Sequence, residues 1–265
     1  MENGSSDESS ASAGEAGGSA VRILRGDFAT ALDRLTVLRF RPRPTAAIGR
    51  DALFFPVVGL LIGAVLYGLD VLLGVSVSQE LSSVLLVAVL TMLTGGRHLD
   101  GFGNTADSLM AFRTRDEALA AMQDRPVGTF GITAIFFVLF VKVRSLDLLA
   151  DDARVIALLS APMLGRWAMV ALAHGAREAG PAGDARKFGR EVGSREFGIA
   201  SAIAFAVMLS TADAIGLATV IVAAGATVGI RIYLHHRLGG INDQSLGAVA
   251  ETVETLVFVF FAFTS

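Results

Sequence analysis

The chain contains no cysteine, and charged residues are scarce: Asp, Glu, Lys and Arg make up 18% of its 265 residues, against about 25% in soluble proteins. The lack of cysteine excludes disulfides, thiolate nucleophiles and thiolate metal sites. With a net charge of −3 and no dense basic face outside the loops, no nucleic-acid partner is expected. None of this fixes the compartment, because a membrane protein that faces the cytoplasm needs no cysteine either.

Hydrophobic residues are abundant instead, at 53%, and they lie in long blocks rather than in amphipathic stripes. A helix needs about 20 apolar residues to cross the hydrocarbon of a bilayer, and several blocks approach this length. We count seven blocks, two of them short: 53–73, 81–94, 130–141, 155–173, 199–210, 214–230 and 246–263. The pattern predicts an all-α fold, a polytopic helical bundle with about seven transmembrane helices, over residues 51–265.

Two segments precede this transmembrane domain. Residues 1–20 are rich in Ser, Gly, Ala and Glu and cannot bury enough apolar surface to order themselves, so we expect a disordered tail. Residues 21–50 carry seven arginines, with apolar residues at roughly helical spacing. We interpret 21–50 as a basic helix that lies in the membrane interface.

The distribution of basic residues predicts the orientation in the membrane. The segments before 53, 97–128, 175–197 and 231–245 hold 18 of the 22 Lys and Arg, whereas the connections between them on the opposite side hold only Arg154. Basic loops stay in the cytoplasm. We therefore expect a multi-pass protein of the cell (plasma) membrane, with its N-terminus and its motif-bearing loops cytoplasmic and its C-terminus outside.

The first cytoplasmic loop carries the most specific polar pattern. Two glycines precede His98 and Asp100, and Asn104 and Asp107 follow. On a helix, positions 100, 104 and 107 fall within about 60° of one another. Carboxylate and amide oxygens suit Mg²⁺, which commonly takes one or two carboxylates plus substrate phosphates. The spacing alone is equally compatible with two acids on a solvated helix, and the glycines favour a shaped turn with a function.

Two further loops place polar residues beside a span. Residues 122–131 include Asp124, a proline and Gly128, a pattern that could leave backbone N–H groups for a phosphate or could be a plain helix cap. Residues 237–248 include the pair Gly239 and Gly240, and two acids, Glu251 and Glu254, follow just inside the span. Acids within spans are candidates for function, although near a span end they can simply reach the headgroups.

At these residues the chain resembles the cobalamin synthase family, adenosylcobinamide-GDP ribazoletransferase, an integral-membrane enzyme of late cobalamin assembly. The resemblance covers about 220 residues from position 35 to the last span. It is carried above all by residues 94–109, with support from 55–59, 122–131 followed by Lys142, 162–169, and 239–240 with 246–248.

The resemblance implies a catalytic domain over 51–265 that joins α-ribazole to adenosylcobinamide-GDP with release of GMP, with Mg²⁺ as cofactor. The implied site residues fall into three groups. Catalytic residues are His98, Asp100, Asp107 and Asp124. Substrate-binding residues are Arg97, Arg125, Gly128, Lys142, Gly239 and Gly240. Metal ligands are Asp100, Asn104, Asp107 and Asp243. His98 could receive the attacking proton, but on a regular helix it lies about 160° from the 100–107 face.

The chain departs from the family pattern at two places. The family usually has aspartate at position 104, where this chain has Asn104, and usually reads Thr-Gly-Asp where residues 242–244 read Asn-Asp-Gln. A divergent or inactive member that serves as a non-catalytic membrane partner therefore stays open, as does a homo-oligomer. A transporter is less favoured because the spans look nearly free of ionisable groups. A lipid-type phosphotransferase is disfavoured because its Asp-Gly-x-x-Ala-Arg motif is absent.

Overall fold

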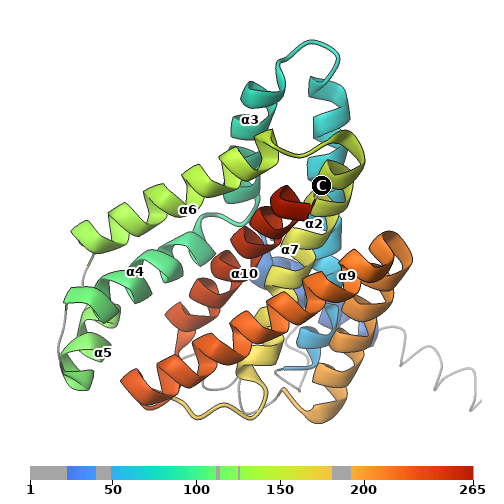
Figure 1. The fold of residues 1–265 in the computed structure, drawn as a ribbon. Helices are drawn as coiled ribbons and strands as arrows, with labels where there is room; N and C mark the ends of the chain where they lie inside the picture. The colour runs from blue at the N-terminus through green and yellow to red at the C-terminus, as the bar shows by residue number, and fades with distance from the viewer. Residues whose placement is uncertain (1–22, 40–48, 112–113, 125, 181–191, 265) are drawn as a thin grey trace, which may run out of the picture.

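The computed structural model describes residues 23–39, 49–111, 114–124, 126–180 and 192–264, and within them it is built from helices without a β-strand. The elements are η1 (Arg50–Phe54), α2 (Phe55–Leu73), α3 (Gln79–Leu93), α4 (Arg97–Ala111), α5 (Arg115–Asp124), α6 (Thr129–Asp147), α7 (Asp151–Ala173), α9 (Ser194–Leu238) and α10 (Asp243–Thr264). Figure 1 shows them as one bundle. The all-α prediction is confirmed.

The membrane spans are fewer than the seven expected. Among the described residues, five helices are long and apolar enough to cross a bilayer, and α3 with α4 makes a sixth if this pair, bent by 91°, counts as one broken span. The remaining block, 199–210, is helical as part of α9 but does not reach the length and hydropathy of a span on its own. The polytopic membrane architecture itself is confirmed.

Helix α9 folds back on itself, although hydrogen bonding is helical along its whole length. The Phe197 ring stacks on His174 with ring centroids 4.8 Å apart, and Arg231 donates to the His174 carbonyl at 2.8 Å. On a straight helix with a rise of 1.5 Å per residue, Phe197 and Arg231 would be about 50 Å apart. The two arms of the ribbon, visible in Figure 1, therefore correspond to the predicted blocks 199–210 and 214–230.

Helix α7 forms the centre of the bundle, and α10 packs beside it. Of the most apolar stretch of α7, 78% is buried, against 28% for α6 at the periphery. Glycines allow the closest helix contacts: a Cβ atom at Gly63 of α2 would lie 2.6 Å from the Leu158 carbonyl oxygen of α7. The backbones of α2 and α7 therefore touch, as small residues at a helix contact allow.

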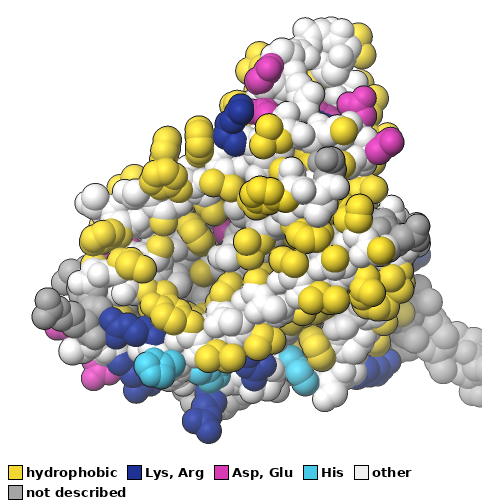
Figure 2. Space-filling view, in the orientation of Figure 1, with side chains coloured by type: hydrophobic (Ala, Val, Ile, Leu, Met, Phe, Trp, Pro, Cys, Tyr) yellow, Lys and Arg dark blue, Asp and Glu magenta, His cyan; other side chains and the backbone are white. Residues whose placement is uncertain are grey.

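The periphery is apolar, as a lipid-facing surface must be. Helix α6 alone exposes Phe130, Ile132, Phe136, Phe137 and Phe140. In Figure 2 hydrophobic side chains form a broad belt, with the His and most of the Lys and Arg side chains in view along the lower edge, and most of the acidic ones near the upper end. An apolar surface of this size would promote aggregation in water, and contact with lipid explains why it is exposed here.

The described part of the basic N-terminal segment is a helix over residues 23–35. Its apolar side packs on the bundle, because Ala31 and Leu35 are buried and the Phe28 ring meets Phe54 of η1 edge to face at 5.5 Å between centroids. The predicted disordered tail, 1–20, lies outside the described residues, and the interfacial location of 21–50 stays a prediction.

Candidate active site

A sharp turn directs the most specific motif into the bundle. Helix α3 ends at Leu93, and Gly95 and Gly96 follow with φ angles of 63° and 68°. This left-handed region suits glycine because residues with a Cβ atom are strained there. The chain turns by 91° and continues as α4. The shaped turn expected from these glycines is thus present.

Helix α4 lies wedged between α6 and α10 rather than in a solvated loop (Figure 1). A Cβ atom at Gly101 would lie 2.8 Å from the Gln244 carbonyl oxygen of α10, and one at Gly247 would lie 2.7 Å from the His98 carbonyl oxygen. The backbones of α4 and α10 therefore touch at this crossing. On the other side, a Cβ atom at Gly103 would meet Ile135 of α6. The motif helix is held by glycine contacts on both flanks.

The three oxygen-bearing residues of the predicted metal face make two separate sets of contacts. Asn104 is buried and donates from Nδ2 to Asp100 Oδ2 at 3.1 Å. Asp107 points toward α6, where its Oδ1 accepts the Gly131 N–H at 3.2 Å. The N-terminal N–H groups of a helix lack partners within it, so Asp107 caps α6. Asp100 and Asp107 share a helical face as expected but serve different neighbours.

Asp100 instead shares a cavity with Asp243, the first residue of α10. The cavity has a volume of about 570 Å³ and is lined by Arg34, Gly95, Gly96, Arg97, His98, Asp100, Met169, Asp243, Gln244, Leu246 and Gly247. It brings together the motif helix, the turn before it, the start of α10 and the N-terminal helix. The sequence predicted the first three of these components and missed Arg34.

The oxygen donors of this cavity fit a magnesium ion that is shared with a phosphate ligand. Two carboxylates, of Asp100 and Asp243, line it, and Mg²⁺ commonly binds one or two carboxylates, several waters and the phosphates of its substrate. The described part of the chain holds no group of three or more His, Asp or Glu that could enclose a metal alone. The donor set is therefore suited to a metal–substrate pair rather than to a closed structural metal site.

Behind the cavity, four charged side chains form a buried network that crosses three helices. Lys142 of α6 pairs with Glu251 of α10 at 2.5 Å and also with Glu254, which in turn pairs with Arg166 of α7. All four are at most 6% exposed. Charges removed from water must be paired, and two cations here neutralise two acids.

This network corrects two sequence-based interpretations. The spans are not nearly free of ionisable groups, because Arg166 lies inside α7 and Lys142 inside α6. Glu251 and Glu254 are buried partners of these cations rather than acids that reach the headgroups. The sequence did contain a signal for this network: two cations and two acids at i, i+3 spacing lie in otherwise apolar helices. Such residues seldom stay unpaired in a membrane, so they could have been predicted to pair with one another.

The network reaches the cavity through His98. Arg166 Nη2 lies 3.5 Å from His98 Nδ1. A guanidinium carries only donors, so Nδ1 must be the acceptor, and a neutral His98 then carries its proton on Nε2. In that form Nε2 is a donor. In this tautomer His98 offers a neighbouring group a hydrogen-bond donor rather than a proton acceptor.

Other predicted binding residues have structural partners. Arg97 Nη1 donates to the carbonyls of Asp33 and Arg34 at 3.3 and 3.1 Å, and Nη2 donates to that of Thr36 at 3.4 Å, so Arg97 binds the C-terminal end of the N-terminal helix. Lys142 is held in the buried network. Substrate contact by either residue stays a prediction.

The glycines predicted to bind substrate end or begin helices. Gly128 is the N-cap of α6, and Gly239 is the C-cap of α9 with φ 78°. A Cβ atom at Gly240 would clash with the backbone of 177–178, a segment that pairs with Ile241. Asp124 is the last residue of α5, its side chain lies outside the described part of the chain, and so does all of Arg125.

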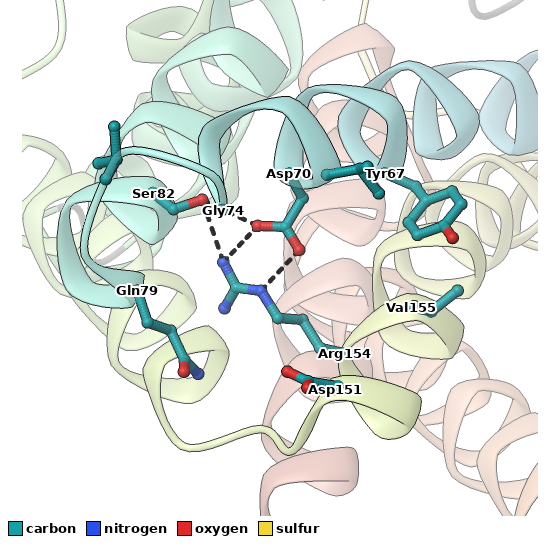
Figure 3. A pocket seen from close by; sticks show the side chains of 10 residues that line it. Tyr67, Asp70, Gly74, Gln79, Ser82, Asp151, Arg154 and Val155 are labelled. Atoms are coloured by element: carbon teal, nitrogen blue, oxygen red, sulfur yellow. Dashed lines mark hydrogen bonds and ion pairs between the residues drawn. The ribbon is translucent and has the colours of Figure 1, made fainter.

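A second cavity, of about 460 Å³, lies between α2, α3 and α7. Figure 3 shows its centre, where Arg154 and Asp70 form a two-pronged pair, Nε to Oδ2 and Nη2 to Oδ1, both at 2.9 Å. Arg154 also donates from Nη1 to Ser83 and to the Leu146 carbonyl. Because its donors bind the ends of several helices, this arginine fastens the end of the bundle remote from α4.

Comparison with known proteins finds relatives along most of the chain. The sequence model of a family described as cobalamin-5-phosphate synthase matches residues 27–262. The chain is 32% identical over 209 residues to the adenosylcobinamide-GDP ribazoletransferase of Geotalea daltonii, which covers 79% of this chain and 84% of that protein. It is 34% identical over 241 residues to the enzyme of the same name from Pseudomonas fluorescens strain SBW25, covering 88% and 97%.

A third relative, the adenosylcobinamide-GDP ribazoletransferase of Caldanaerobacter subterraneus subsp. tengcongensis, is 34% identical over 221 residues, covering 81% of this chain and 88% of that protein. No solved structure matches the chain. The matched residues 27–262 include every residue that lines the cavity of Asp100 and Asp243.

Proposed function

The chain belongs to the cobalamin-5-phosphate synthase family, and from that premise we propose that it is a membrane-embedded, magnesium-dependent adenosylcobinamide-GDP ribazoletransferase. The observation that carries the proposal is the cavity where Asp100 of the motif helix meets Asp243 of α10 beside arginine side chains. Such a mixture of carboxylates and guanidinium groups suits a magnesium-bound diphosphate.

In the proposed reaction a free ribose hydroxyl oxygen of α-ribazole, or of its 5′-phosphate, attacks the phosphorus that is linked to cobinamide. A new P–O bond forms to ribazole, the bond between this phosphorus and the bridging oxygen breaks, and GMP leaves with the bonding electrons. The hydroxyl proton is released to solvent. Such transfers need little covalent chemistry from the protein, so alignment and charge neutralisation lower most of the barrier.

Each residue of the cavity has a role that its position supports. Asp100 and Asp243 would hold Mg²⁺, which when bound neutralises charge on the diphosphate. His98, with Nδ1 facing Arg166, would donate from Nε2 to a phosphate oxygen. Asp107 would be a positioning residue that does not touch the substrate, because it holds the start of α6 against α4.

The departures from the family pattern leave a carboxylate at the cavity. Asp243 and Gln244 both line it, so the acid that stands one residue earlier than usual still faces the same space as Asp100. Asn104 hydrogen-bonds Asp100 and brings no negative charge. We therefore expect an active enzyme that needs more Mg²⁺ than relatives with aspartate at 104, rather than a non-catalytic partner.

We further infer that the cavity opens toward the cytoplasm at the plasma membrane. Arg34 and Arg97 line it, and His235, His236 and Arg237 lie in the last turn of α9, close before α10 begins. Acidic Asp151 and Asp152 start α7 at the remote end. Basic residues favour the cytoplasmic side. A transporter is not favoured, because the ionisable groups of α6, α7 and α10 pair with one another.

The test is a reaction in detergent with purified protein, adenosylcobinamide-GDP, α-ribazole and Mg²⁺, in which GMP and adenosylcobalamin are both measured. The proposal predicts equal amounts of the two products and none without Mg²⁺. Arg144→Gln, at an exposed ion pair in the last turn of α6, serves as a control that should react normally. A folded wild-type protein that forms neither product would contradict the proposal.

A further inference from the structure

We propose that Arg34, on the N-terminal helix, binds the diphosphate of the nucleotide substrate in the cavity that Asp100 and Asp243 also line. This inference rests on the proposed function, and it assigns the binding of phosphate to a residue outside the polar loops. The three side chains line the same cavity of about 570 Å³, which is large enough for a diphosphate with its metal ion but too small for the whole substrate.

Hydrogen bonds from α4 and to α3 hold the Arg34 backbone in place. Arg97 donates to the carbonyls of Asp33, Arg34 and Thr36, and the last carbonyls of a helix otherwise lack partners. The Val37 N–H also donates to the Leu93 carbonyl at 2.8 Å, at the end of α3. The end of the N-terminal helix is thereby attached to both sides of the Gly95–Gly96 turn from which α4 begins.

The Arg34 side chain is also oriented. Its Nε donates to Asp51 Oδ2 at 2.9 Å, and Asp51 is only 3% exposed. The other carboxylate oxygen, Oδ1, accepts the Gly49 N–H at 3.2 Å, so Asp51 cannot easily turn away. A guanidinium that is anchored through Nε loses little further freedom when it binds a phosphate.

The charges around the cavity divide between the two parts of a magnesium diphosphate. Carboxylates bind the metal but repel phosphate oxygens, so a site that holds both needs cations close to the carboxylates. Of the two arginines that line this cavity, Arg97 uses its Nη donors on backbone carbonyls. Arg34 is about one-third exposed and lines the cavity from the N-terminal helix, so its guanidinium is placed to contact phosphate.

Arg50 provides a matched control on the same helix contact. It pairs with Asp27 at 3.4 Å across the junction between the N-terminal helix and η1, and its side chain is 39% exposed, close to the 33% of Arg34. Asp27, like Asp51, is buried. Arg50 does not line the cavity. A purely structural role of such ion pairs would therefore affect both variants alike.

The experiment compares wild type, Arg34→Gln, Arg34→Lys and Arg50→Gln as full chains in detergent. Binding of inorganic pyrophosphate in the presence of Mg²⁺ is measured by calorimetry, and KM for adenosylcobinamide-GDP is measured by GMP release. Loss of a charge-assisted phosphate contact should raise both the pyrophosphate Kd and KM about tenfold to a hundredfold in Arg34→Gln. In Arg34→Lys both constants should lie between those of wild type and Arg34→Gln, because an ammonium keeps the positive charge but lacks the paired N–H donors of a guanidinium. Arg50→Gln should stay within about twofold of wild type.

The outcomes separate this inference from the proposed function. Equal losses in Arg34→Gln and Arg50→Gln, or a wild-type protein that binds no magnesium pyrophosphate, would overturn the role of Arg34. So would unchanged KM and Kd in a folded Arg34→Gln protein that transfers ribazole. If wild type transfers no ribazole yet binds pyrophosphate through Arg34, the proposed function fails while the phosphate site stands. Where Arg34→Gln does not survive purification, Arg34→Lys carries the same comparison.

Discussion

The carboxylate of Asp107 accepts a hydrogen bond from the backbone N–H of Gly131 at 3.2 Å, so an acid of the motif helix caps the first turn of α6. A negative charge is favourable there for two reasons: it satisfies an N–H group that has no partner within the helix, and it complements the positive end of the helix dipole. The same carboxylate lies against Gly128. The contact between α4 and the start of α6 thus depends on Asp107, an acid that the sequence suggested as a metal ligand.

This relationship predicts different consequences for the two motif acids. Asp107→Ala should lower the free energy of unfolding by about 1 kcal/mol, as loss of a helix cap does, whereas Asp107→Asn should lose less because an amide oxygen still accepts. Asp100→Asn should leave stability nearly unchanged and raise the Mg²⁺ requirement. Thermal unfolding in detergent and Mg²⁺ titration of GMP release check this. Equal shifts of the Mg²⁺ requirement for Asp100→Asn and Asp107→Asn would show that Asp107 is a ligand after all.

The buried network predicts a large loss of stability when one partner is removed. Glu254 pairs with both Lys142 and Arg166, so Glu254→Ala leaves two buried cations with one acid and should destabilise the fold by about 3–5 kcal/mol. Arg144→Ala breaks an exposed pair with Asp147 and should lose no more than about 1 kcal/mol. The comparison is made by thermal unfolding in one detergent. Similar Tm values for both variants would mean that the network is not formed as described.

The amide at position 104 predicts how the metal requirement can be changed. Asn104 donates to Asp100, so Asn104→Asp replaces a hydrogen bond with two facing carboxylates. Without Mg²⁺ this repulsion should lower the Tm, and with Mg²⁺ the added negative charge should strengthen binding of the ion. We expect half-maximal GMP release at a lower Mg²⁺ concentration than in wild type. A higher requirement, or a Tm that does not respond to Mg²⁺, would count against Asn104 lying beside the metal.

The proposed orientation predicts where reporters appear. Phe263 of α10 lies in a groove with Arg144 and Leu148 at the end of α6, whereas α10 begins at the cavity with Asp243. A reporter fused after Ser265 should therefore be outside, and one inserted near Asp184 should be cytoplasmic. Accessibility to a membrane-impermeant label in intact cells measures both. Labelling of both positions from the same side would contradict this orientation.

Much of the fold was predictable because lipid imposes a simple rule on sequence. Long apolar blocks predict helices, and the blocks at 53–73, 155–173 and 246–263 correspond to α2, α7 and α10. The bend inside α9 fell between two predicted blocks. The span count differed because block 199–210 does not reach the length and hydropathy of a span, and because α3 stops short at Leu93 and continues, after a bend of 91°, as the polar helix α4. Hydropathy cannot identify a polar helix that is buried in protein.

The site was predictable only in part, because spacing along one helix does not show what each side chain faces. The spacing placed Asp100 and Asp107 on one face, but α6 approaches at Gly131 and draws Asp107 to its N-terminus. Arg166 and Arg34 were missed because neither lies in a polar loop. Their roles depend on contacts with His98 and with the cavity, which join residues far apart in the sequence.

The measurement that tests the account most directly is the release of GMP by Asp243→Asn over a range of Mg²⁺ concentrations, with formation of adenosylcobalamin measured in parallel. Asp243 and Asp100 line one cavity from two helices, so removal of either charge should weaken the same metal–diphosphate complex. We predict that Asp243→Asn and Asp100→Asn both need at least about tenfold more Mg²⁺ than wild type, as the loss of one charged ligand contact implies, while both proteins remain inserted and folded. A folded Asp243→Asn protein with the Mg²⁺ dependence and rate of wild type would contradict the placement of the reaction between α4 and α10.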